Sequence, residues 1–77
     1  MKTIHNEAYR KSIALLKAKR LEQGITQDQL AEKMQVGQAL ISKIETCERR
    51  LDIIELREIC KSIGISFSEF TQEISTF

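Results

Sequence analysis

The stretch TQDQLAEKMQVGQALISKIE, residues 26–45, decides how this chain folds. On both sides of the triplet 35–37, apolar residues recur at spacings of three and four, the pattern of amphipathic helices. Because so short a joint separates the predicted helices 27–34 and 38–46, the two must cross at a steep angle. The small side chain of Ala31 lets them approach closely. The expected inward-facing residues are Leu30, Ala31, Met34, Val36, Ile41 and Ile44.

The opposite side of the 38–46 helix carries small or polar side chains that have no obvious partner inside a small domain. Short polar groups with one long cation suit the major groove of DNA, where base edges offer donors, acceptors and thymine methyls. An ordinary solvated helix surface is the alternative reading of the same side chains. The residues concerned are Gln38, Ala39, Ser42 and Lys43.

Capping signals and apolar stripes predict an all-α fold of five helices. Each of three helices is preceded by a capping residue with a Glu or Gln three positions later, the spacing of a capping box. These pairs are Thr26 with Gln29, Asp52 with Glu55, and Ser66 with Glu69. The expected helices span about 6–23, 27–34, 38–46, 53–63 and 67–75.

The composition favours one small helical domain over the whole chain, 1–77. Of the 77 residues, 42% are apolar and 30% are charged, which argues against disorder. A domain of this size has a modest core and often depends on a partner chain. We find neither a long apolar run nor the apolar centre of a signal peptide, so we expect a cytoplasmic protein.

The same inventory argues against an enzyme or a metalloprotein. The chain has no glycine-rich phosphate loop and no nucleophile–His–acid set, and it is too short to enclose a substrate. His5 has no Cys or His companion at metal-ligand spacing, so we expect no metal, cofactor or small-molecule ligand. The net charge is only +1, but residues 1–24 hold six basic and two acidic residues, whereas residues 51–77 hold two and five. This asymmetry could orient the protein on an acidic surface.

The run from Ile25 to Ser66 resembles the helix-turn-helix of the lambda-repressor-like (Cro-type, XRE) transcriptional regulators. The resemblance is carried by Thr26-Gln27, Leu30-Ala31, the apolar residue before Gly37, Ile41-Ser42-x-Ile44-Glu45, and Leu56-x-x-Ile59. It implies a compact five-helix domain, of bacterial or phage origin, that regulates transcription. It also implies binding to double-stranded DNA as a two-fold dimer, with each third helix in a major groove about one turn apart.

The resemblance also assigns roles to particular residues. Gln38, Ala39, Ser42 and Lys43 match base-reading positions, and an amide at Gln38 can pair bidentately with adenine. In the family, the DNA backbone is contacted at the positions that match Gln27, Thr46, Arg49 and Arg50. For the two arginines, ordinary solvated loop charges are the alternative. Arg20 and Glu45 match a salt bridge that holds the third helix to the first.

Three positions depart from the family pattern. Gln35 replaces a glycine that often has a positive φ, Gly37 replaces a Ser or Thr cap, and Cys47 replaces a Gly or Asn at the end of the third helix. A non-glycine residue at a positive φ costs about 1 kcal/mol. These departures bear on affinity more than on fold.

The last eleven residues carry an apolar stripe, which we expect to exceed what the domain's own core can cover. The surplus predicts a homodimer seam through the fifth helix, 67–77, to which the fourth helix could contribute, with a monomer as the alternative. A short regulator of the restriction–modification controller type is one possible subtype. An antitoxin-like protein-interaction module and a helical adaptor that does not bind DNA remain as alternatives. The seam residues are Phe67, Phe70, Ile74 and Phe77.

Overall fold

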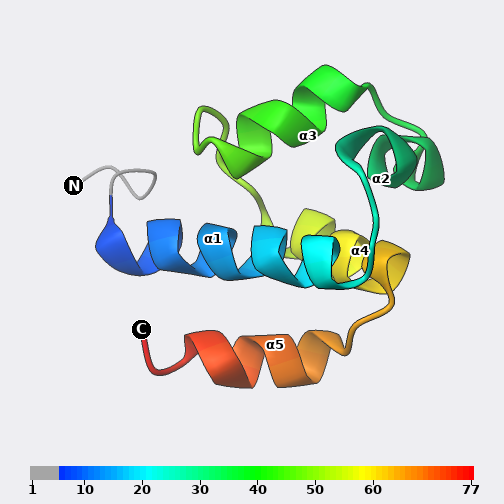
Figure 1. Cartoon of the computed structure of the whole chain (residues 1–77). Helices are drawn as coiled ribbons and strands as arrows, with labels where there is room; N and C mark the ends of the chain where they lie inside the picture. The colour runs from blue at the N-terminus through cyan, green and yellow to red at the C-terminus, as the bar shows by residue number, and fades with distance from the viewer. Residues whose placement is uncertain (1–5) are drawn as a thin grey trace.

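This computed structural model describes residues 6–77, which fold into five helices joined by turns (Figure 1). Their bounds differ from the predicted ones by at most one residue at either end, and no strand occurs among the described residues. The predicted all-α, five-helix fold is therefore confirmed. The helices are α1 (Glu7–Glu22), α2 (Gln27–Met34), α3 (Gln38–Glu45), α4 (Ile53–Ile63) and α5 (Phe67–Ile74).

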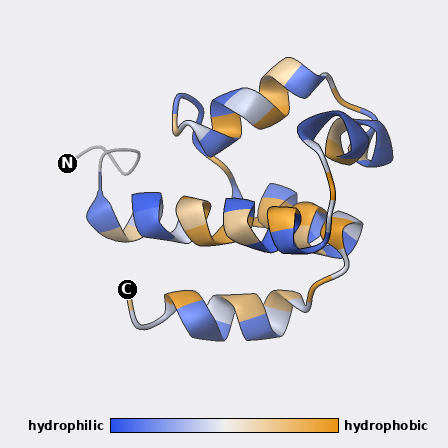
Figure 2. Cartoon of the chain, in the orientation of Figure 1, coloured by the Kyte–Doolittle hydropathy of each residue, from blue (hydrophilic) through white to orange (hydrophobic). Residues whose placement is uncertain are grey.

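Helix α1 runs through the middle of the molecule, with α3 on one side of it and α5 on the other (Figure 1). Helix α2 packs against α3 and α4, and α4 packs against α5. Hydrophobic and hydrophilic residues interchange along each helix, as Figure 2 shows, so every helix has one side suited to the core. The buried core cluster is Leu16, Leu30, Ala31, Ile41, Ile44, Ile59, Cys60, Ile63 and Phe70.

Local side-chain caps begin three of these helices at the predicted residues, and two of the three form complete capping boxes. Thr26 and Asp52 each form a complete capping box, with Gln29 and Glu55 respectively. Ser66 accepts a hydrogen bond from the amide of Glu69, but the Glu69 side chain does not accept the reciprocal bond from the Ser66 amide. Farther along α5, the Glu73 carboxylate lies 3.1 Å from Lys19 Nζ, and this ion pair links α5 to α1.

The expected seam along α5 needs a correction at Phe70. Its ring is only 1% exposed and belongs to the core cluster, so it offers no surface to a second chain. Phe67 and Ile74 are partly buried against the same core. Only Phe77 is largely exposed, at 46%. The core therefore takes up more of the stripe than the sequence pattern suggested, because α5 lies directly over α1 and α4.

None of the described helices is both long enough and apolar enough to cross a membrane. Within residues 6–77, no three His, Cys, Asp or Glu side chains are grouped as a metal site would require. His5 lies outside the described residues.

Candidate nucleic-acid interface

The turn between α2 and α3 depends on a left-handed residue. Gln35 has φ 58° and ψ 44°, and the amide of Val36 donates to the carbonyl of Ala31 at 3.0 Å. This bond closes the last turn of α2 in the manner of a Schellman motif, and Val36 turns back onto the core. Gly37 then caps α3 with extended backbone and no side-chain bond. The change of direction between α2 and α3 thus depends on the left-handed backbone of Gln35 and the extended backbone of Gly37.

Helix α3 has two chemically different sides. Ile41 and Ile44 are buried in the core cluster, whereas Gln38, Ala39 and Lys43 are exposed and Ser42 is half-buried. All four residues predicted to read bases lie outside the core cluster. The exposed side presents an amide, a methyl group and an ammonium group within two turns of helix.

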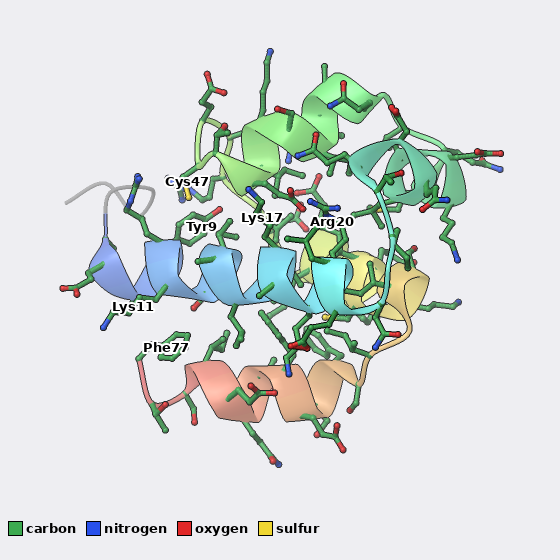
Figure 3. The ribbon with its side chains drawn as sticks, in the orientation of Figure 1. Tyr9, Lys11, Lys17, Arg20, Cys47 and Phe77 are labelled. Carbon is green, nitrogen blue, oxygen red and sulfur yellow. The ribbon has the colours of Figure 1, made fainter. Side chains whose placement is uncertain are left out.

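A buried ion pair holds α3 against α1. Arg20 Nε lies 2.7 Å from Glu45 Oε2, and Arg20 Nη2 donates to Glu45 Oε1 at 2.9 Å. Both side chains are nearly inaccessible, at 5% and 6% exposure. Arg20 also donates to the carbonyl of Ile25 at 2.6 Å, and Figure 3 shows it pointing from α1 toward α3. This is the pairing that the family resemblance implied.

The ion pair continues into a chain of side-chain hydrogen bonds that reaches the exposed side of α3. Gln27 Nε2 donates to Glu45 Oε1 at 2.9 Å, and Gln38 Nε2 donates to Gln27 Oε1 at 2.6 Å. Three helices contribute to it: Arg20 comes from α1, Gln27 from α2, and Gln38 and Glu45 from α3. The sequence analysis treated these residues separately and did not predict the hydrogen bonds between them, although amides and a carboxylate can form such bonds.

The loop after α3 is braced by its own side chains. Cys47 holds a left-handed conformation with φ 62°, and the amide of Glu48 donates to the carbonyl of Lys43 at 2.9 Å. The Thr46 hydroxyl lies 2.7 Å from a carboxylate oxygen of Glu48. Cys47, which replaces the more usual glycine, is partly buried.

The Arg49 side chain, which is 40% exposed, is paired with another side chain of the protein, and the sequence analysis did not predict this pair. Its guanidinium donates two hydrogen bonds to the Glu55 carboxylate, at 3.1 and 2.8 Å. The hydrogen bond to Arg49 lowers the pKa of Glu55, and the same bond raises the pKa of Arg49. The predicted backbone contact of Arg49 thus competes with an existing pair, whereas Arg50 beside it is exposed.

Tyr9 fastens the far end of this loop, a contact absent from the sequence reading. Its hydroxyl accepts a hydrogen bond from the amide of Leu51 at 2.8 Å, and Figure 3 shows its ring beside Cys47. Burial raises the pKa of the Tyr9 phenol. Nothing local in the sequence pairs residues so far apart.

Comparison with known proteins identifies the family to which this arrangement of helices belongs. A family model described as helix-turn-helix matches residues 16–70, which include the α2–turn–α3 unit. The chain is 32% identical over 59 residues to the uncharacterized HTH-type transcriptional regulator YqaF of Bacillus subtilis, covering 77% of this chain and 78% of YqaF. The chain belongs to the XRE family of helix-turn-helix transcriptional regulators.

Solved structures of this family share the whole fold. An XRE-family like protein from Pseudomonas syringae superposes with a TM-score of 0.90 at 38% identity, covering 96% of this chain and 90% of the other. The wild-type restriction-modification controller protein C.Esp1396I superposes with a TM-score of 0.83 at 32% identity, covering 94% of each chain. As an XRE-family member, the protein is a DNA-binding transcriptional regulator.

Proposed function

We propose that this regulator binds a roughly palindromic duplex as a homodimer, with α3 in the major groove. The observation that carries the proposal is the two-sided character of α3. Its apolar side is buried in the core, and its other side exposes Gln38, Ala39 and Lys43 to solvent. An exposed amide, methyl group and cation correspond to the side chains that read adenine, thymine and guanine edges.

The DNA backbone is contacted by residues that flank this face. Gln27 is the first residue of α2, where the helix dipole favours a phosphate. Arg50 and Thr46 are exposed in the loop after α3. Arg49 has weaker support, because Glu55 already occupies its guanidinium.

A second copy of the chain covers an apolar groove beside α4. The groove, of about 210 Å³, is lined by residues of α1, α4 and α5, among them Tyr9, Ile53 and Ile74. Ile53 and Ile54 at the start of α4 are 64% and 53% exposed, unusually high for isoleucine. Phe77 is joined to Ile74 by a backbone hydrogen bond. We therefore move the predicted seam from Phe70 to Ile53, Ile54, Ile74 and Phe77, with Phe67 retained only at its margin.

The solved controller protein supports a more specific role. Because this chain matches nearly the full length of a restriction-modification controller, the controller subtype is the role we favour. Its regulation would then depend on operator occupancy and protein concentration.

Selection from random duplexes, followed by binding of variants, tests the proposal. Lys43→Ala should change base preference at one position of each half-site, by about 1–3 kcal/mol where the contact is to guanine. Arg50→Ala should weaken all duplexes alike and lower the salt dependence by about one counterion.

Lys61→Ala on α4 is the matched control, since it removes the same charge from an exposed position on another helix. It should leave the preference as in wild type. The assignment of α3 to base reading is wrong if Lys43→Ala and Arg50→Ala both bind every duplex like wild type.

A further inference from the structure

We propose that Glu45 sets the base preference of Gln38 by fixing the direction in which hydrogen bonds run through Gln27. This inference rests on the proposed function, because it takes Gln38 as a base-reading residue. Glu45 and Gln27 are then positioning residues, which act on DNA sequence through the amide of Gln38.

The argument begins with the chemistry of Glu45. An ionised carboxylate only accepts hydrogen bonds, and Arg20 only donates them. Glu45 Oε1 accepts from Arg20 Nη2 and also faces Gln27, at 2.9 Å in both cases. Gln27 must therefore turn its NH2 group, and not its oxygen, toward Glu45.

The direction of the bond from Gln27 to Glu45 fixes the direction of the next bond, between Gln38 and Gln27. With its nitrogen turned to Glu45, Gln27 presents Oε1 to α3, and this oxygen accepts from Gln38 Nε2 at 2.6 Å. Gln38 in turn holds its nitrogen toward Gln27. Its oxygen and its second N–H remain for a ligand, and these two groups match the N6 amino group and N7 of adenine.

The ion pair at which this series of hydrogen bonds begins is shielded from solvent, whereas Gln38, at which it ends, is exposed. Arg20 and Glu45 are 5% and 6% exposed, whereas Gln38 is exposed. Water therefore does not compete for the Glu45 carboxylate as it does for Gln38. A buried charge pair is in this way connected through two amides to the surface that meets the base pairs.

The substitution Glu45→Gln should reverse the direction of these hydrogen bonds. Arg20 bonds to both oxygens of Glu45, so in the variant it keeps only the bond from Nε, which the amide oxygen accepts in place of Oε2. The NH2 group then takes the place of Oε1 and donates to Gln27, so Gln27 and then Gln38 turn over. The atom of Gln38 farther from Gln27 changes from an acceptor oxygen to a donor nitrogen. Its partner on the base must then be an acceptor, such as guanine O6 or N7.

The first test measures binding of wild type and Glu45→Gln to duplexes that differ at single base pairs. Wild type should prefer adenine at the Gln38 position by about tenfold, and the variant should lose or reverse that preference. Glu48→Gln is the matched control, because it removes the same charge from the loop just after α3, outside the chain of bonds. The control should change affinity for all duplexes alike and leave the preference intact.

Gln27→Leu provides a second variant, since Glu45→Gln leaves the buried Arg20 without its anionic partner and could unfold the protein. Gln27→Leu keeps the Arg20–Glu45 pair and removes both bonds to Gln27. The preference for adenine should relax toward equal binding of the four base pairs. Loss of a phosphate contact by Gln27 cancels in this ratio, because every duplex offers the same phosphates.

A measurement without DNA separates this inference from the proposed function. In nuclear Overhauser spectra, the Gln27 NH2 protons should lie near the Arg20 guanidinium in wild type and near Gln38 in folded Glu45→Gln. If wild type shows no base preference, the proposed function fails, and these spectra still test the direction of the chain. A folded Glu45→Gln or Gln27→Leu variant that keeps the wild-type preference for adenine would overturn the inference.

Discussion

Gln35 has a backbone conformation that glycine adopts more readily. Its φ of 58° lies in the left-handed region, where the Cβ atom of an L-residue approaches its own carbonyl oxygen. The turn keeps this conformation because Val36 must return to the core and its amide must reach Ala31. The family resemblance pointed to this position, and the structure gives the physical reason.

Gln35→Gly should therefore stabilise the protein. We expect a gain of about 0.5–1 kcal/mol in the free energy of unfolding, less than the full strain because glycine also gives the unfolded chain more freedom. Urea denaturation measures the change. Gln72→Gly, at an exposed helical position of α5, is the control and should lose about 1 kcal/mol. A loss at both positions would show that Gln35 is not strained.

Helix α4 and the loop before it are joined by Glu55, which serves two partners. Its carboxylate completes the capping box with Asp52 and also accepts the two bonds from Arg49. The capping box was predicted from spacing alone. The pairing with Arg49 was not, because it depends on the path of the loop 46–52.

Glu55→Gln should lower stability at neutral pH and not in acid. The hydrogen bond from Arg49 lowers the pKa of folded Glu55 below its ordinary value of 4.5. The unfolded chain therefore takes up this proton first as the pH falls. The stabilisation is complete above about pH 4.5 and is lost as the pH falls through the folded pKa.

Thermal or urea denaturation at several pH values measures this difference between wild type and Glu55→Gln. We expect about 0.5–1 kcal/mol at pH 7 for a partly exposed pair, with the cap retained by the glutamine oxygen. Glu32→Gln on α2 is the control for loss of one exposed charge. A difference that persists unchanged into acid would show that the charge of Glu55 is not responsible.

At the scale of the whole molecule, the apolar groove beside α4 determines the expected state of assembly. Ile53→Glu should shift the protein from dimer to monomer in sedimentation equilibrium, because it places a charge in the proposed seam. The helix itself should tolerate the change, since Ile53 is 64% exposed and an acidic residue suits the first turn. Binding to a two-half-site duplex should weaken far more than binding to a single half-site.

Leu21→Glu is the matched control for this test. Leu21 is 58% exposed on α1 and does not line the groove. This variant should sediment like wild type. A monomeric wild type, or an Ile53→Glu variant that remains dimeric, would rule out this seam.

The sequence by itself determined where the helices begin and end. Caps such as Thr26 and Asp52 act within three residues, so their effect can be predicted from local spacing. The same local period identified the outward side of α3. The tertiary structure alone decided that Phe70 belongs to the core, that Arg49 is held by Glu55, and that Gln38 is connected through Gln27 to Glu45. Each of these depends on residues that only the packing of separate elements brings within contact distance.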